Sequence, residues 1–223
     1  MTLIDYPGKI AATVFTVGCN FRCPFCHNPE LVLSNWMGGR GSVSEEEFFD
    51  FLEKRQGKLN GICITGGEPT IQKDIVEFIE KIKSLGYAVK LDSNGTRPDV
   101  LKKVIDKKIV DYIAMDIKNS LENYEKACGT KVDQDRIDLS VGLIRNSGTH
   151  YEFRTTVVPG IHEYSDFEKI GKWLEGSRRY VLQEYREGKI LDESLKKMTK
   201  GKKLDLEKIK GIMGKYLDKV DVR

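Results

Sequence analysis

Apolar residues in this chain gather in short runs that are separated by longer amphipathic stretches. Six of the runs are rich in β-branched or aromatic residues and are bounded by turn-forming residues, a pattern typical of buried strands. Between the runs, apolar positions recur at helical spacing, and Ser44 with Glu47 three residues later matches a capping box. The chain is therefore predicted to repeat a strand–helix unit six times, with strands over residues 10–17, 60–65, 87–91, 110–115, 151–158 and 180–185.

The predicted strands are apolar on both faces, which indicates a parallel sheet covered by helices. In such folds the reactive groups collect beyond the carboxyl ends of the strands. Three distinctive motifs follow predicted strands in this way: Gly66-Gly67-Glu68-Pro69, Asp92-Ser93-Asn94 and Asp116-Ile117-Lys118. Six units are too few for a closed eight-stranded barrel, so periodicity alone leaves an open partial barrel and a doubly wound open sheet as alternatives.

The last part of the chain differs from the rest in composition. From Arg186 onward lysine dominates, and apolar positions between residues 204 and 213 recur at amphipathic spacing. We therefore expect residues 1–190 to form the core domain and residues 191–223 a lysine-rich helical cap packed on it. A docking surface for a large acidic partner is the alternative interpretation of this tail.

Length and charge narrow the class of protein. A chain of 223 residues can bury one substantial core, and its net charge of +3, intermixed until the tail, does not suggest nucleic-acid binding. The sequence has no apolar run long enough to span a bilayer and no charged-then-apolar leader. We expect a cytoplasmic protein without nucleic-acid or membrane partners, in a compartment where thiols stay reduced.

Three of the five cysteines, Cys19, Cys23 and Cys26, lie within eight residues. Three soft ligands on one short loop can hold three irons of a cubane iron–sulfur cluster, which leaves the fourth iron open to a small molecule. Residues 23–27 also fit the pattern for covalent haem attachment, although that chemistry belongs outside the cytoplasm. A structural zinc site that adds His27 to the three cysteines is the other alternative.

The cysteine spacing, with Phe25 just before the third cysteine, resembles the radical S-adenosylmethionine (radical SAM) superfamily. The longer run over residues 3–31, which includes Asp5-Tyr6-Pro7-Gly8, is similar to the activating enzymes of glycyl-radical enzymes, and most of all to the anaerobic ribonucleotide reductase activators. The resemblance extends over about residues 3–190. It implies an α/β fold, a partial, open (β/α)6 TIM-like barrel, with one 4Fe-4S cluster held by the three cysteines and S-adenosylmethionine as cofactor.

The resemblance also implies how the cofactor is held. Gly66 and Gly67 would let the backbone approach it, Glu68 would accept a hydrogen bond from its ammonium group, and Lys118 would meet its carboxylate. The full set of expected cofactor-binding residues is Phe25, Cys26, His27, Gly66, Gly67, Glu68, Asn94, Asp116, Lys118 and Tyr185. No catalytic side chain beyond the cluster and cofactor is expected.

The remaining polar and cysteine positions are interpreted either from the same family resemblance or as packing and surface residues. Asp92, Ser93 and Asp116, with the carbonyl of Ala114, resemble a monovalent cation site of those activators. Formate-lyase activators place a histidine near the sixth strand end, where this sequence has Gln183 and Tyr185. The sequence therefore does not decide which residues contact the adenine, or whether formate lyase is the substrate. The isolated residues are expected to pack or to lie on the surface: Cys63, Cys128, His150 and His162.

The implied enzyme cleaves S-adenosylmethionine reductively and removes an α-hydrogen from a glycine in a partner protein. The expected partner is an anaerobic ribonucleoside-triphosphate reductase, and the expected electron donor is a flavodoxin or ferredoxin. One alternative is a radical SAM enzyme that acts on a small molecule or peptide, as in a deazapurine ring contraction. The non-enzyme alternative is a zinc-binding interaction module.

Overall fold

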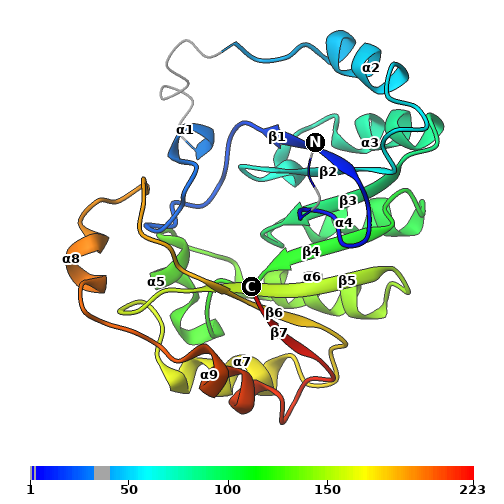
Figure 1. Ribbon diagram of the computed structural model, residues 1–223. Helices are drawn as coiled ribbons and strands as arrows, with labels where there is room; N and C mark the ends of the chain where they lie inside the picture. The colour runs from blue at the N-terminus through cyan, green and yellow to red at the C-terminus, as the bar shows by residue number, and fades with distance from the viewer. Residues whose placement is uncertain (1, 3, 33–40) are drawn as a thin grey trace.

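The computed structural model describes residues 2, 4–32 and 41–223. Within them, seven parallel strands form one sheet whose spatial order follows the chain, as the ribbon shows from β1 to β7 (Figure 1). The strands are β1 Ala11–Thr16, β2 Gly61–Gly66, β3 Ala88–Ser93, β4 Tyr112–Asp116, β5 His150–Val157, β6 Tyr180–Glu184 and β7 Val220–Val222.

The sheet is open, because β1 and β7 stand at opposite ends of the strand order. This confirms the predicted open partial barrel, with one strand more than the six that the sequence predicted. The additional strand, β7, pairs in parallel with β6, so that Val220 lies opposite Tyr180. Its three residues are too short a run to be recognised by alternation, and they follow a lysine-rich stretch that indicated only helix.

The helices lie along the sheet and connect successive strands (Figure 1). The capping box at the start of α2 is confirmed, since the Ser44 side chain accepts from the Glu47 backbone and the Glu47 carboxylate accepts from the Ser44 N–H. The helical segments are α1 Pro29–Val32, α2 Glu45–Glu53, η2 Pro69–Ile71, α3 Ile75–Ser84, α4 Pro98–Asp106, η3 Leu121–Asn123, α5 Tyr124–Cys128, α6 Gln134–Asn146, α7 Tyr164–Trp173, α8 Leu195–Thr199 and α9 Leu206–Met213.

Alternation along the strands divides the sheet into two unlike faces. One face contributes fully buried aliphatic residues to the core that the helices cover, for example Ile62 and Ile64 of β2. The other, inner face carries buried charged residues, among them Lys90, Asp92 and Glu152. The strands are therefore not apolar on both faces as the sequence analysis assumed, because the inner face of the half-barrel is lined by ion pairs.

The segment before β1 closes the amino-terminal end of this inner face. Tyr6 is buried, packs with Ala11 and Ala114, and its ring centroid lies 6.1 Å from that of Tyr112. The Asp5 carboxylate accepts a hydrogen bond from the Thr13 hydroxyl at 2.7 Å. The Asp5-Tyr6-Pro7-Gly8 run thus packs against the sheet at the amino-terminal ends of the strands. This end of the half-barrel lies away from the carboxyl ends of the strands.

The lysine-rich tail is bound to both the sheet and the cysteine loop. The backbone N–H groups of Leu191 and Asp192 donate to the carbonyls of Cys26 and Pro24, each at 3.0 Å. Farther along, α9 packs against α7, and the chain ends in β7. Among the described residues, no helix has the length and apolar character needed to cross a membrane.

Candidate active site

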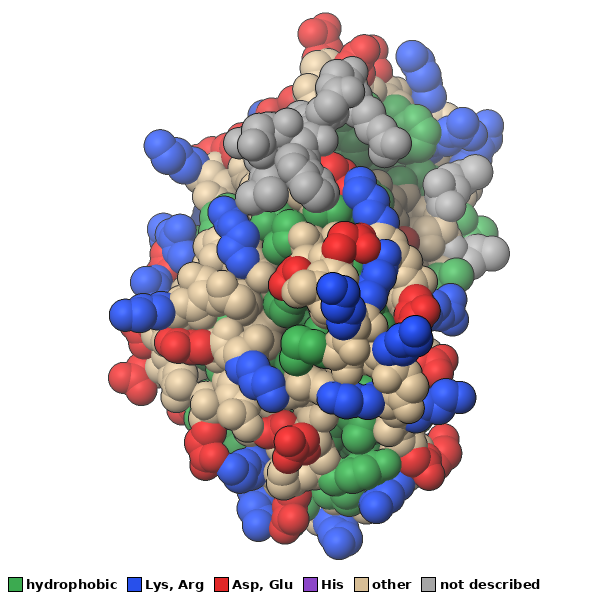
Figure 2. Space-filling view, turned by 90° about the vertical axis from the view of Figure 1, so that its left-hand side faces the viewer, with side chains coloured by type: hydrophobic (Ala, Val, Ile, Leu, Met, Phe, Trp, Pro, Cys, Tyr) green, Lys and Arg blue, Asp and Glu red, His purple; other side chains and the backbone are tan. Residues whose placement is uncertain are grey.

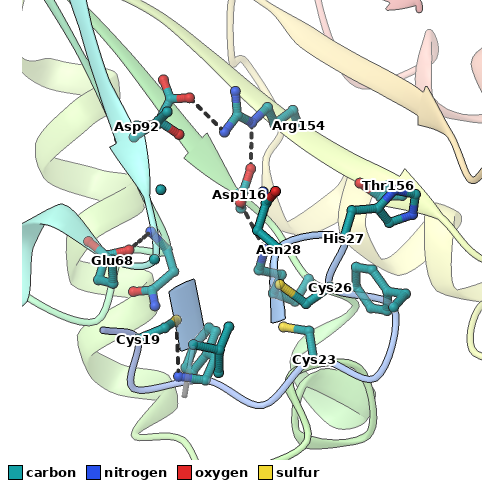
Figure 3. A pocket seen from close by; sticks show the side chains of 18 of the residues that line it. Cys19, Cys23, Cys26, His27, Asn28, Glu68, Asp92, Asp116, Arg154 and Thr156 are labelled. Carbon is teal, nitrogen blue, oxygen red and sulfur yellow. Dashed lines mark hydrogen bonds and ion pairs between the residues drawn. The ribbon is translucent and has the colours of Figure 1, made fainter. Parts of the chain in front are cut away.

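A cavity of about 350 Å³ opens where the cysteine loop meets the carboxyl ends of the strands. Small-ligand sites range over roughly 300–1,000 Å³, so this cavity has the size of a small-ligand site. It brings together motifs that are far apart in the sequence (Figure 3). Its walls are formed by Cys19, Phe21, Cys23, Phe25, Cys26, His27, Asn28, Val32, Thr65, Gly66, Gly67, Glu68, Pro69, Asp92, Ser93, Asn94, Asp116, Lys118, Arg154, Thr156, Gln183, Glu184 and Arg186.

The cysteine loop is held in one shape by hydrogen bonds along its backbone. The Arg22 guanidinium donates to the carbonyls of Cys19 and Phe21, both at 2.7 Å, and the Arg22 N–H donates to the Cys128 carbonyl at 2.8 Å. Next to this contact, Gly129 has φ +66°, and a Cβ there would lie 2.2 Å from the Arg22 carbonyl oxygen. Only glycine at position 129 therefore lets the loop approach α5 so closely.

The three thiols of the loop face a common space (Figure 3). Burial raises the pKa of Cys19 to about 11 and that of Cys23 to about 12, while Lys118 opposes the shift. Such thiols lose their protons when a metal centre binds them. Within the described residues, no group of three His, Cys, Asp or Glu side chains is arranged around a single ion. In a cubane cluster each thiolate binds a different iron, which requires a wider spacing of the sulfurs.

The two glycines at the end of β2, Gly66 and Gly67, make room for a neighbouring stretch of the chain. Gly66 has φ +114°, and a Cβ there would lie 2.4 Å from the Thr16 nitrogen. A Cβ on Gly67 would lie 2.0 Å from the Gly18 carbonyl oxygen. Both residues line the cavity, and the end of β1 and the residue Gly18 after it approach them too closely for a side chain.

Glu68 is buried at the base of the cavity, and the protein itself supplies donors to both carboxylate oxygens. Its Oε2 accepts from the Asn94 N–H at 2.6 Å, and its Oε1 accepts from the Ser93 hydroxyl at 2.9 Å and the Thr70 N–H at 3.1 Å. These bonds fix the end of β3 against η2. Glu68 thus holds β3 and η2 together within the protein. This role is additional to the hydrogen bond that was expected between Glu68 and the ammonium group of S-adenosylmethionine.

Asp116 and Lys118 lie together at the end of β4, with Lys118 Nζ 2.8 Å from Asp116 Oδ2. Burial raises the pKa of Asp116, but the charges of Arg154 and Lys118 outweigh it and hold that pKa well below its usual range. In turn, Asp116 raises the pKa of Lys118 against the effect of burial. Both groups are therefore charged at neutral pH, and Lys118 is a cation at the wall of the cavity that contains the thiols.

Sequence analysis missed Arg154, whose guanidinium contacts both Asp92 and Asp116. It also missed Asn28 and Thr156, which line the same cavity (Figure 3). A signal was present in β5, where the charged Glu152 and Arg154 alternate with the aromatic Tyr151 and Phe153. Polar residues at period two inside an apolar run indicate a strand face that is not part of the hydrophobic core.

Tyr185 differs from its expected place. It is not among the residues that line the cavity; its ring packs edge-on against His27, with the centroids 5.8 Å apart. The reason is local, because β6 ends at Glu184 and the alternation of the strand does not continue to Tyr185. At this strand end the cavity is lined by Gln183, Glu184 and Arg186 instead.

The isolated residues occupy supporting positions. His150 is exposed, whereas His162 is buried, with its Nε2 2.8 Å from the Lys118 carbonyl and its Nδ1 accepting from the Val158 N–H at 3.0 Å. Cys63 and Cys128 are buried outside the cavity wall. His162 thus steadies the backbone that carries Lys118.

Comparisons with known proteins show the family to which the chain is similar. The family model described as the radical SAM superfamily matches residues 13–174. The chain is 35% identical over 230 residues to a protein of Methanocaldococcus jannaschii that is provisionally named a glycyl-radical enzyme activating enzyme, and the match covers 100% of this chain and 92% of that protein.

Other matches are shorter or concern the fold alone. The chain is 34% identical over 152 residues to the pyruvate formate-lyase-activating enzyme of Listeria monocytogenes, covering 63% of this chain and 59% of that enzyme. It is 37% identical over 121 residues to the 7-carboxy-7-deazaguanine synthase of Haemophilus influenzae, covering 53% and 49%. The crystal structure of Streptococcus suis SuiB bound to S-adenosylmethionine aligns with a TM-score of 0.70 at 15% identity, over 96% of this chain and 50% of that one.

Proposed function

The chain belongs to the radical SAM superfamily, and on that premise we propose that it activates a glycyl-radical enzyme by removing an α-hydrogen from one of the partner's glycines. The observation that carries the proposal is the similarity to the Methanocaldococcus jannaschii protein, which extends over the whole of this chain. Because the chain belongs to this family, its cysteine loop is no longer interpreted as a site of covalent haem attachment or as a zinc-binding module. The partner we propose is an anaerobic ribonucleoside-triphosphate reductase, on the basis of the resemblance over residues 3–31.

The residues at the strand ends fit the two cofactors that this family uses. Cys19, Cys23 and Cys26 would hold a 4Fe-4S cluster, because they present three buried or half-buried thiols to one space. When bound, the cluster and S-adenosylmethionine supply an electron and a 5′-deoxyadenosyl radical, which is the difficult chemistry of the reaction. The protein's contribution is to bind, to orient and to exclude water.

Two side chains are placed to orient the S-adenosylmethionine. Lys118 is a partly buried cation whose Nζ donates to Asp116 and has further N–H groups to offer to a carboxylate. Asn94 lines the cavity from the end of β3, and its side-chain oxygen and nitrogen are held by Thr96 and Asn20, so the amide is fixed in one orientation. We assign Lys118 to the amino-acid carboxylate and Asn94 to the ribose, with Phe25 and His27 at the rim of the site.

The open sheet supports a macromolecular substrate. The cluster and S-adenosylmethionine would together occupy the cavity of about 350 Å³, so a further substrate would approach it from outside. The edge strand β1 borders the site, because Phe15 lies opposite Thr65, which lines the cavity. Phe15 is 54% exposed and offers an apolar contact to a backbone segment of the partner. Glycine suits this reaction because the flanking amides stabilise its Cα radical and no side chain crowds it.

The test is to mix the reduced protein, S-adenosylmethionine and the anaerobic ribonucleotide reductase of the same cell. We expect an electron paramagnetic resonance doublet from a glycyl radical with one α-hydrogen. When the glycines of the reductase are deuterated, we expect deuterium in 5′-deoxyadenosine, because that hydrogen is transferred directly. A reductase carrying alanine in place of the radical glycine is the matched control and should give neither signal.

Two outcomes would contradict the proposal at different levels. Cofactor cleavage without a glycyl radical in the reductase would remove the reductase as partner. If every glycyl-radical protein of that cell failed as well, a small-molecule reaction would take its place. The similarity to 7-carboxy-7-deazaguanine synthase over 121 residues makes a deazapurine precursor the first compound to try.

A further inference from the structure

Asp92 and Asp116, which the sequence analysis assigned to a monovalent cation, are bridged by an arginine instead. Arg154 Nη2 lies 3.0 Å from Asp92 Oδ2, and Arg154 Nε lies 2.5 Å from Asp116 Oδ1. The pairing of β4 with β5 sets this contact, since Arg154 is the register partner of Asp116. Figure 3 shows the guanidinium between the two carboxylates, at the wall of the cavity.

The remaining oxygens of the two carboxylates also contact fixed cations. Lys90 Nζ binds Asp92 Oδ1, and Lys118 Nζ lies 2.8 Å from Asp116 Oδ2. The charges therefore alternate from Lys90 through Asp92, Arg154 and Asp116 to Lys118, with three cations for two carboxylates. Each of the four carboxylate oxygens already has a cationic partner from the protein itself.

The third expected ligand, Ser93, is also committed elsewhere. Its hydroxyl donates to Glu68 at 2.9 Å and accepts from the Gly95 N–H at 3.0 Å. A hard cation binds through several oxygen ligands, and a carboxylate oxygen that already accepts from a protein cation is a poorer ligand because the two cations repel each other. The residues present here do not fit a bound alkali metal ion, because the guanidinium occupies the position between the two carboxylates.

Burial makes this arrangement consequential. The side chains of Lys90, Asp92 and Arg154 are 2%, 10% and 15% exposed. In such surroundings charges interact strongly, and a carboxylate that loses its partner is costly to keep ionised. Without the guanidinium, Asp92 and Asp116 would face each other as like charges and would need a proton or another cation between them.

We propose that Arg154 is a built-in cation: it positions Asp116, and through it Lys118, at the cavity wall, and it makes the site independent of alkali metal ions. The inference rests on the proposed function only where S-adenosylmethionine binding serves as a readout. Its other readout, thermal stability in different salts, is independent of any reaction with a partner protein.

The experiment compares chloride salts of potassium, sodium and tetramethylammonium at equal ionic strength. For the wild-type protein, reconstituted anaerobically, we expect the same unfolding temperature and the same S-adenosylmethionine affinity in all three. For Arg154→Gln we expect affinity to fall about tenfold or more in tetramethylammonium, since charge-assisted bonds to Asp116 are lost. Potassium or sodium should restore most of this affinity and raise the unfolding temperature, because an alkali ion can enter between the carboxylates.

Arg179→Gln is the matched control. Arg179 also lies on the inner face, with its Nη2 3.0 Å from Asp221, but it has no contact with Asp92 or Asp116. Its replacement should lower stability by an amount that no alkali ion restores. A general salt effect on a weakened protein would instead make the two variants respond alike, and that result would overturn the inference.

Two further results would also overturn it. One is a wild-type protein whose stability or cofactor affinity rises with potassium or sodium at constant ionic strength. The other is a folded Arg154→Gln protein that responds to neither ion. If Arg154→Gln does not fold in any salt, Arg154→Lys decides the matter: lysine keeps the charge but cannot bridge both carboxylates, so an alkali-ion response must appear there.

Discussion

The inner face of the half-barrel carries two clusters of charged residues, and they differ in whether a ligand can reach their charged groups. In the lower cluster, at the amino-terminal ends of the strands, the fully buried Glu152 accepts from Arg223 at 3.0 and 3.1 Å and from the Tyr112 hydroxyl at 2.8 Å. In the upper cluster, at the carboxyl ends, Asp116 is bound as firmly by Arg154 and Lys118. Only the upper cluster borders a cavity with free thiols.

The comparison teaches that buried charge by itself does not identify an active site. Both clusters shift pKa values through burial and ion pairing, and both are tied together by side chains from several strands. In the lower cluster the charged groups satisfy one another, so it stabilises the sheet where β7 joins it. In the upper cluster Lys118 keeps donors free beside the cysteine loop, which is what a binding site requires.

The largest expected effect comes from the cysteine loop above the upper cluster. In Cys23→Ala the cluster loses one of its three protein ligands, so we expect reductive cleavage of S-adenosylmethionine to be abolished. Cys63→Ala and Cys128→Ala remove buried thiols outside the cavity and should retain cleavage. Product analysis by chromatography, with iron determination after anaerobic reconstitution, measures both. Full activity in Cys23→Ala with intact iron content would refute the ligand assignment.

A smaller effect is expected from Lys118, the residue of the upper cluster whose N–H groups are available to a ligand. Lys118→Ala should leave iron content unchanged and weaken S-adenosylmethionine binding, because a cation beside the cavity is lost. A charge-assisted hydrogen bond contributes roughly 1.5–3 kcal/mol, so affinity should fall by about one to two decades. Equilibrium binding to the reconstituted protein measures it. An unchanged affinity would show that Lys118 serves only as the partner of Asp116.

Much of the upper region could be predicted because its signals are local in sequence. The cysteine spacing, the Gly66-Gly67-Glu68-Pro69 turn and the Asp116-Ile117-Lys118 motif each follow an apolar run, and parallel strands bring their carboxyl ends together. The family resemblance rested on these motifs and on residues 3–31, and the open barrel was what that resemblance implied. The strand β7 did not, since three residues carry too little periodicity and depend on pairing with β6.

The missed features of the site depend on contacts between distant residues. Arg154 meets Asp116 across 38 residues, and this contact is set by strand register rather than by any local pattern. Glu68 sits in a recognisable motif, but Ser93 and Asn94, which bind its carboxylate, come from the next strand. A sequence can indicate which residues are polar and near a strand end; the fold decides which of them neutralise one another.

The lower cluster should affect stability without affecting the cofactor. In Glu152→Gln the arginines beside it, Arg223 and Arg179, lose a buried carboxylate partner, so the free energy of unfolding should fall by about 1–3 kcal/mol. Cofactor affinity per folded molecule should not change. Denaturant unfolding and equilibrium binding measure the two quantities separately. If affinity fell as much as in Lys118→Ala, the division into two clusters would be wrong.

The smallest expected effect concerns His162, which supports the upper cluster from below through the Lys118 carbonyl. Burial lowers the pKa of His162 below its usual value of 6.5, and its hydrogen bond to the Lys118 carbonyl does not offset this. Below about pH 6.5 the unfolded chain therefore takes up a proton at this residue that the folded protein does not. Stability should accordingly be lost as the pH falls through this range, by at most about 1.4 kcal/mol per pH unit.

His162→Gln isolates this contribution, because glutamine can still donate to the Lys118 carbonyl and does not titrate. We expect its free energy of unfolding to depend less on pH between about 6.5 and 5 than that of the wild type, while the two curves run parallel above pH 7. Urea unfolding at a series of pH values measures the difference, and His150→Gln, at an exposed position, controls for the loss of a histidine. Identical pH dependence in the wild type and His162→Gln would mean that the buried imidazole takes up its proton without loss of the fold.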